Sequence, residues 1–256
     1  MNLIRIAVTG MHRGANPQPG SSIVSAIRRR WPQAFIVGLV YDAYESGIYV
    51  GDGPDACHTM PYPTAGLPTY LARLKEVKAL APFDLLIPTL DAEIALLAGA
   101  SEKLAALGIQ VMLPDEKTLD RCSKSKLPAL ADTCGIKVPA TAVARDVCEA
   151  LKHAEVIGYP VFIKGRFYDA TRVSNPVALA SAGASILADW GAPLIVQEPL
   201  LGNEFNVMGI GDGRGGSLGQ CAVRKMILSD KGKGNGSVIV RDPRLEEITK
   251  RVMAET

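Results

Sequence analysis

The chain has 256 residues, of which 48% are hydrophobic and 21% charged, and its formal net charge is +2. These values predict a folded globular protein with two structural units, and they exclude a disordered chain. A charge so close to neutral argues against nucleic acid or an anionic membrane as the main partner. No apolar run is long enough to span a bilayer. The five scattered cysteines form no CxxC pair, which favours reduced thiols and a cytoplasmic location.

The first half of the sequence alternates strand-like and helix-like segments. Near-continuous apolar strands between helices predict a parallel sheet covered on both faces. Residues 1–114 are therefore expected to form a Rossmann-like domain, with Ser21 and Ser22 offering the N-cap of its first helix. We expect strands at 3–9, 34–40, 56–60, 83–88 and 110–113, and helices at 23–31, 67–80 and 92–107.

The second half reads as α+β with antiparallel hairpins. Pro114 and Asp115 mark the predicted domain boundary, and the helix that follows, at about 116–134, must be kinked or divided at Pro128. A glycine-rich turn at 211–216 joins two predicted strands, which indicates a hairpin. The other expected strands are at 138–141, 161–164, 194–197, 204–210, 218–228 and 237–240, with helices at 146–156, at 176–190 and from 244 onward and a polar loop at 229–236.

The loop after the first strand, Gly10-Met11-His12-Arg13-Gly14, has two possible readings. It lacks the G-x-G-x-x-G spacing of dinucleotide-binding loops, and Asp42 lies about ten residues later than that fingerprint requires. A plain strand-to-helix turn is the favoured interpretation, with an anion held at the start of the helix as a weaker one. A Rossmann-type dehydrogenase remains an alternative function.

Two acids follow the fourth predicted strand, at the edge where open parallel sheets bind ligands. We favour structural roles for both: Asp91 as the cap of the next helix and Glu93 in its first turn. A substrate-binding role is the secondary interpretation.

Two lysines stand out in the second half. Lys164 ends the predicted strand at 161–164 after Gly-Tyr-Pro, and Lys124 lies on the predicted helix after the boundary. A lone lysine at a strand end is usually solvated. A lysine ammonium also binds phosphate oxygens as a point charge.

The lysines belong to a set of polar residues that is more specific than any one of them. The strand at 194–197 runs into Gln197 and Glu198, and Glu204 follows after Gly-Asn. Backbone groups after Val196 suit the edge of an adenine ring, and a carboxylate accepts hydrogen bonds from ribose hydroxyls. Together with the lysines, this set predicts an ATP site between two small sheets.

With these motifs the chain resembles the ATP-grasp superfamily, most closely its branch similar to the large subunit of carbamoyl phosphate synthase. The members activate a carboxylate as an acyl phosphate with ATP and pass it to an amine or another nucleophile. The resemblance rests on Gly-Ile-Lys-Val-Pro at 135–139, Gly-Tyr-Pro-Val-Phe-Ile-Lys at 158–164, Val-Gln-Glu-Pro-Leu at 196–200 and Gly-Asn-Glu-Phe-Asn-Val at 202–207. It implies an N-terminal lobe at 115–196 and a partial C-terminal lobe at 197–256, after the Rossmann-like domain.

The resemblance also implies a role for each residue of the set. Lys124 and Lys164 would contact the ATP phosphates, and Glu204 would bind the ribose. The segment between the two lobes, called the hinge below, would contact adenine, largely through backbone groups. A group of basic residues would line the end of the site that holds the phosphates. The hinge residues are Gln197, Glu198 and Leu200, and the basic group is Arg224, Lys225 and the loop at 231–235.

The sequence departs from the family pattern in two places. Family members usually have a glycine-rich loop that covers the phosphates, but residues 165–172 of this chain carry Arg166 and Arg172 instead. These arginines could replace the loop electrostatically. We favour the interpretation that both are solvated. The family's magnesium ligands, a Glu and a Glu-x-Asn pair, would lie beyond Thr256. The last acids read instead as a helix cap and a helix face; they are Asp242, Glu246 and Glu247.

The resemblance therefore implies ATP and Mg²⁺ as cofactors, but this chain offers no ligands for the metal. The expected function is that of an ATP-dependent ligase acting on a small carboxylate. The C-terminal lobe is expected to be incomplete, either because the chain is cut short or because a second chain completes the site. The alternative is a nucleotide-binding module without catalytic activity. No catalytic base or nucleophile is assigned.

Overall fold

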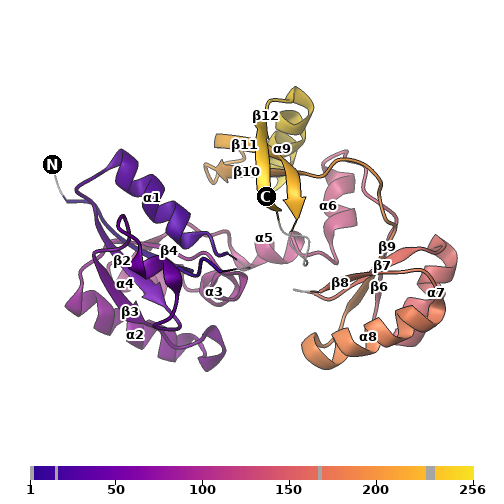
Figure 1. Ribbon diagram of the computed structural model, residues 1–256, viewed down its shortest axis with the longest axis horizontal. Coiled ribbons are helices and arrows are strands. Elements are labelled where there is room, and N and C mark those ends of the chain that lie inside the picture. Colours follow the sequence, from indigo (N-terminus) through magenta and orange to yellow (C-terminus); the bar gives the residue numbers. More distant parts are fainter. Residues whose placement is uncertain (1–2, 15–16, 167–168, 229–233) are drawn as a thin grey trace. The chain divides into compact units, whose positions relative to one another are not determined.

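The computed structural model describes residues 3–14, 17–166, 169–228 and 234–256. The chain divides into two compact units, Met1–Leu119 and Asp120–Thr256 (Figure 1).

Unit 1 contains a five-stranded sheet in the order β3-β2-β1-β4-β5, and every neighbouring pair of strands is parallel. The expected parallel sheet is thus confirmed. Its strands are nearly all apolar because both faces are covered. They are β1 (Arg5–Thr9), β2 (Phe35–Val40), β3 (Ala56–Thr59), β4 (Leu85–Ile87) and β5 (Gln110–Val111).

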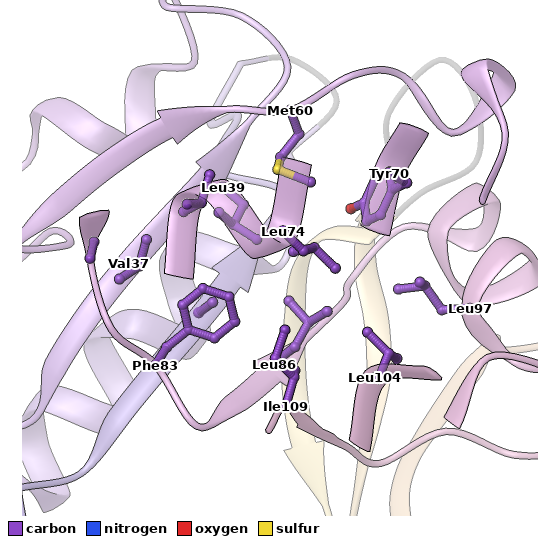
Figure 2. Packing of buried hydrophobic residues seen from close by; sticks show 13 residues of the cluster. Val37, Leu39, Met60, Tyr70, Leu74, Phe83, Leu86, Leu97, Leu104 and Ile109 are labelled. Atoms are coloured by element: carbon purple, nitrogen blue, oxygen red, sulfur yellow. The ribbon is translucent and has the colours of Figure 1, made fainter. Parts of the chain in front are cut away.

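Two hydrophobic clusters cover the two faces of this sheet. Side chains alternate along a strand, so Ala7 of β1 belongs to one cluster while its neighbours Ile6 and Val8 belong to the other. In the first cluster, Tyr70 and Leu74 pack among the strand residues (Figure 2). The helical elements of the unit are α1 (Gly20–Arg30), η1 (Ser46–Tyr49), η2 (Pro63–Ala65), α2 (Leu67–Leu80), α3 (Asp91–Leu97) and α4 (Ser101–Ala106), and α5 (Glu116–Arg121) crosses the boundary to unit 2.

Two details of unit 1 differ from the sequence-based prediction. The helix expected at 92–107 is divided into α3 and α4 around Gly99, where a side chain would stand 2.3 Å from Glu116 Oε1. The predicted serine cap of α1 is wrong, because Pro19 occupies the N-cap position and no side chain caps the helix. The two serines lie in the first turn, because α1 already begins at Gly20.

Unit 2 contains a four-stranded sheet in the order β6-β9-β7-β8 with antiparallel pairing throughout. Helices α7 (Val147–Ile157) and α8 (Pro176–Trp190) contribute to the same core cluster as its strands (Figure 1). The strand expected at 138–141 begins only at Thr141. Strand β8 was not predicted from the sequence. The strands are β6 (Thr141–Ala144), β7 (Val161–Lys164), β8 (Ala170–Val173) and β9 (Leu194–Gln197).

A second sheet of unit 2 has the antiparallel order β10-β11-β12. Helix α9 (Pro243–Glu255) packs on one face, where a side chain at Gly209 would stand 2.2 Å from the Met253 Cε atom. The strands are β10 (Phe205–Gly211), β11 (Ser217–Leu228) and β12 (Gly234–Val240). Residues 234–236 of the polar loop expected at 229–236 belong to β12, and the rest lies outside the described residues.

The helix expected at 116–134 is divided into α5 and α6 (Leu127–Thr133). The break precedes Pro128, which lies in the first turn of α6, where its missing N–H group costs no hydrogen bond. Lys124 consequently lies in the turn between the two helices and not on a helix, as the sequence had suggested.

Candidate functional site

The side chain of Lys164 is fixed by a short chain of hydrogen bonds across three strands. Its Nζ atom donates to Gln197 Oε1 at 2.5 Å, and Gln197 Nε2 donates to Thr141 Oγ1 at 3.0 Å. Val161 and Ile163 enter the core, so by alternation Lys164 projects from the opposite face of the sheet. The ammonium group is thus held on the face that α7 and α8 leave uncovered.

The charge on Lys164 interacts with two other predicted site residues. Burial lowers the pKa of Lys164, the like charge of Lys124 lowers it further, and the carboxylate of Glu204 acts in the opposite direction. Lys124 and Glu204, from two other segments of the sequence, therefore both lie within electrostatic range of Lys164.

The segment after β9 exposes a backbone acceptor and a backbone donor. The amide of Glu198 donates to Ala140 O at 2.8 Å, and Glu198 Oε2 accepts from the Ala140 amide at 3.1 Å. Within the described residues, by contrast, neither the carbonyl of Glu198 nor the amide of Leu200 is hydrogen-bonded. Pro199 between them has no N–H group. This leaves one acceptor and one donor for the edge of a planar heterocycle.

Glu204 and Lys225 pair at the start of the three-stranded sheet. Lys225 Nζ forms an ion pair with Glu204 Oε1, and the Lys225 amide donates to Glu204 O at 2.9 Å. The Glu204 side chain remains 56% exposed, so its carboxylate is accessible to hydroxyl groups of a ligand.

The side chains of Arg224 and Lys225 have different partners. Consecutive residues of a strand point to opposite faces, and Arg224 instead donates to Asn203 Oδ1 at 2.6 Å. The expectation that both side chains line one phosphate end stays a prediction. Most of the basic loop at 231–235 lies outside the described residues.

Both arginines of the segment 165–172, where related enzymes have the phosphate-covering loop, are exposed. Arg172 lies on β8 opposite Phe162, and Arg166 follows β7. Residues 167–168 between them lie outside the described residues.

The described residues contain no group of three or more His, Cys, Asp or Glu side chains that would hold a metal ion. Asp242 caps α9 and pairs with Arg244, as expected for a helix cap. Glu247 pairs with Arg251 one helical turn later. Magnesium prefers carboxylates arranged around one point, and these side chains do not fit that requirement.

In unit 1, Glu93 proves to be a buried connector at the carboxyl edge of the parallel sheet. It is fully buried, and it accepts hydrogen bonds from Thr9 Oγ1 and Tyr41 Oη, both at 2.5 Å, and from the Thr89 amide at 3.1 Å. Burial raises its pKa. Glu93 therefore ties together the ends of β1, β2 and β4, whereas Asp91 is not the N-cap of α3, a position that Leu90 occupies.

This role of Glu93 could not be predicted from the sequence. Its partners lie at least 52 residues away in the sequence at Thr9 and Tyr41, and an acid in the first turn of a helix is ordinarily explained by the helix dipole.

Solved structures similar to this chain are ATP-grasp enzymes. One is L-amino acid ligase from Bacillus licheniformis, with a TM-score of 0.68 and 16% identity over 99% of this chain and 60% of that chain. A second is a complex of biotin carboxylase from Campylobacter jejuni with βγ-ATP, with a TM-score of 0.68 and 16% identity over 99% and 59%. A third is the ADP complex of N5-carboxyaminoimidazole ribonucleotide synthetase, with a TM-score of 0.67 and 11% identity over 100% and 64%.

This likeness shows that the chain shares the fold of the part of these enzymes that it covers. The chain spans between 59% and 64% of the length of these three structures. No protein-family model matches the sequence, and neither does any curated protein. Among the described residues, no helix combines the length and apolar character needed to cross a membrane.

Proposed function

We propose that unit 2 binds ATP, with Lys124 and Lys164 at the phosphates, the hinge at adenine and Glu204 at the ribose. The observation that carries this proposal is that Lys124 and Glu204, from two other segments of the sequence, both act on the charge of Lys164, which Gln197 holds by a hydrogen bond. Two ammonium groups at one place repel each other and cost free energy. A bound polyphosphate removes that cost by neutralising both charges.

The open backbone groups of the hinge support the placement of adenine. The carbonyl of Glu198 suits the exocyclic amino group of adenine, and the amide of Leu200 suits the ring nitrogen beside it. Because Glu198 is held to Ala140 by two hydrogen bonds, the hinge is fixed before the nucleotide arrives. Lys225 joins the ribose end through its ion pair with Glu204.

We further propose that this nucleotide site belongs to a ligase that joins a carboxylate to an amine or another nucleophile. A carboxylate oxygen of the substrate would attack the γ-phosphorus of ATP and expel ADP, and the nucleophile would then displace phosphate from the acyl phosphate. The role of the residues named here is to bind and orient the nucleotide, which dominates phosphoryl-transfer catalysis. A lineage close to the large subunit of carbamoyl phosphate synthase is part of the proposal, as is a cytoplasmic location, which suits five free cysteines.

The second candidate is a nucleotide-binding module without turnover, or a subunit that a partner chain completes. It is favoured by the absence of a metal-ligand group from the described residues. Release of phosphate from ATP, in the presence of Mg²⁺ and mixtures of small carboxylates and amines, distinguishes the two candidates. A ligase releases phosphate only when both acceptors are present, and a module releases none.

The binding proposal is tested by isothermal titration of the full chain with ATP, ADP, AMP and NADH at constant ionic strength. We expect ATP and ADP to bind and AMP to bind about tenfold more weakly or worse, because it lacks the phosphates that reach the lysines. Binding of NADH without binding of ATP would favour the Rossmann-type dehydrogenase. If none of the four nucleotides binds, the proposal fails.

A further inference from the structure

Unit 1 carries a polar surface hollow of about 550 Å³ at the amino end of α1. Its walls come from the loop after β1, the first turns of α1 and the segment after η1. The residues that matter below are Arg13, Ser21, Ser22, Ser25, Arg29 and Asp52. None of them belongs to the proposed ATP site.

At the two ends of this loop, the described residues are held in place by hydrogen bonds of their backbone amides. The Gly20 amide donates to Gly10 O at 2.9 Å, and the Arg13 amide donates to Ser46 Oγ at 3.1 Å. A side chain at position 20 would stand 2.0 Å from Thr9 O, so only glycine lets α1 begin so close to the end of β1. The hollow is therefore preformed.

Arg13 and Arg29 bring two positive charges to the hollow. Neither guanidinium group forms a hydrogen bond or ion pair with any residue that the structure describes. The neighbours of Arg29 on α1 differ in this respect, because Arg28 pairs with Asp55 at 2.7 Å and Arg30 lies over the ring of Trp31.

Asp52 supplies the single negative charge of the hollow, and it already has a partner. Ser25 Oγ donates to Asp52 Oδ2 at 2.7 Å. This hydrogen bond lowers the pKa of Asp52, and the charges of Arg13 and Arg29, which line the same hollow, lower it further. Two arginines against one aspartate leave a net positive charge.

The first turn of α1 adds neutral donors. The amides of Ser21 and Ser22 make no hydrogen bond within the described part of the chain, as is usual at a helix start. Ser21 lines the hollow and is only 8% exposed, yet its hydroxyl group has no partner among the described residues. Because Ser21 lines the hollow, its hydroxyl group is available to a ligand there.

We propose that this hollow binds the oxyanion group, phosphate or carboxylate, of a small molecule. Arg13 and Arg29 would supply the charge-assisted hydrogen bonds, and the serine hydroxyls and the amides of α1 would supply the remaining donors. The hollow is several times larger than one phosphate group, so the rest of the molecule also finds room there. This site does not depend on the proposed ATP site.

The test uses the full chain carrying Lys164→Ala, so that anions are not bound by the lysine of unit 2. Inorganic phosphate and acetate are titrated separately at constant ionic strength, with detection by calorimetry. We expect at least one of the two anions to bind, and we expect Arg13→Gln and Arg29→Gln each to weaken binding by about fivefold or more. The anion that binds more tightly identifies the group.

Arg30→Gln is the matched control, because it removes the same charge from the next residue of α1. It should change the affinity by less than about twofold, since screened surface charges contribute little. The proposal is overturned if neither anion binds, or if Arg30→Gln weakens binding as much as Arg29→Gln. Circular dichroism confirms that each variant keeps the fold of the parent chain.

Discussion

The two sheets of unit 2 are built to different degrees of burial. The four-stranded sheet shares with α7 and α8 a cluster of ten buried residues. In the three-stranded sheet, among the described residues, Ala222 alone is buried. Apolar residues on the face of that sheet opposite α9 stay exposed, among them Met208 at 55% and Ile239 at 72%.

The difference matters for the proposed nucleotide site, which takes residues from both sheets. Lys164 and Gln197 stand on the well-packed sheet and are half-buried and hydrogen-bonded. Glu204 stands at the edge of the poorly covered sheet, and its side chain is largely exposed. The phosphate end and the hinge are therefore held in place before the nucleotide binds, whereas the surroundings of the ribose end hold Glu204 less firmly.

The largest effect is expected for truncation of matched isoleucines in the two sheets. Ile163→Ala removes a fully buried side chain from β7 and should lower the free energy of unfolding by about 2–4 kcal/mol. Ile239→Ala removes one that is 72% exposed on β12 and should cost less than about 1 kcal/mol. Urea denaturation measures both. Equal losses would show that the three-stranded sheet is covered in solution.

The next effect is on ATP binding. Lys164→Met keeps the length of the half-buried side chain but removes its charge. It should weaken ATP binding at least tenfold, because a charge-assisted contact with phosphate contributes about 1.5–3 kcal/mol. Lys152→Met, which changes an exposed lysine of α7, is the control and should leave the affinity unchanged. Equal affinities of the two variants would remove Lys164 from the site.

A smaller effect is expected at the ribose. Glu204→Gln keeps an acceptor oxygen but loses the charge, and it should weaken ATP binding by about two- to tenfold. The expected loss of affinity is smaller than for Lys164→Met because Glu204 is exposed, so water competes for the same hydrogen bonds. Fluorescence titration with ATP and with 2′-deoxy-ATP checks the assignment: the variant should discriminate less between the two nucleotides than the parent chain does. Undiminished discrimination would place the ribose elsewhere.

The smallest effect is a dependence on pH. Burial and the charge of Lys124 lower the pKa of Lys164, so this lysine loses its proton at a lower pH than a solvated lysine does. Phosphate binds the charged form, so ATP affinity should be complete below the lowered pKa and should fall as the pH rises through it. The fall should be weaker in Lys164→Met. The assignment would be contradicted if the ATP affinity of the parent chain stays constant up to the pH at which an ordinary lysine loses its proton.

Elements whose signals are local could be predicted from the sequence. Helix α8 has the bounds expected for it, because Asn175 caps its start and Gly191 ends it. Strands β7 and β9 also lie where their apolar runs place them.

Features that depend on distant partners could not be predicted. Strand β8 has the sequence Ala-Thr-Arg-Val and is a strand because it pairs with β7. At the break around Gly99, the atom that a side chain would meet belongs to Glu116 of another helix. For the candidate site, the residue types could be recognised from motifs, whereas the pairing of Glu204 with Lys225 required the register between β10 and β11.

The central claim is that adenine binds at the hinge of unit 2. Amide resonances of the ¹⁵N-labelled chain, recorded with and without ATP, test it most directly. We predict that the Leu200 amide shifts strongly on addition of ATP, as expected for a donor that gains a hydrogen bond, while the amides of β2 and β3 in unit 1 stay unchanged. A Leu200 resonance that does not move at saturating ATP would contradict the claim.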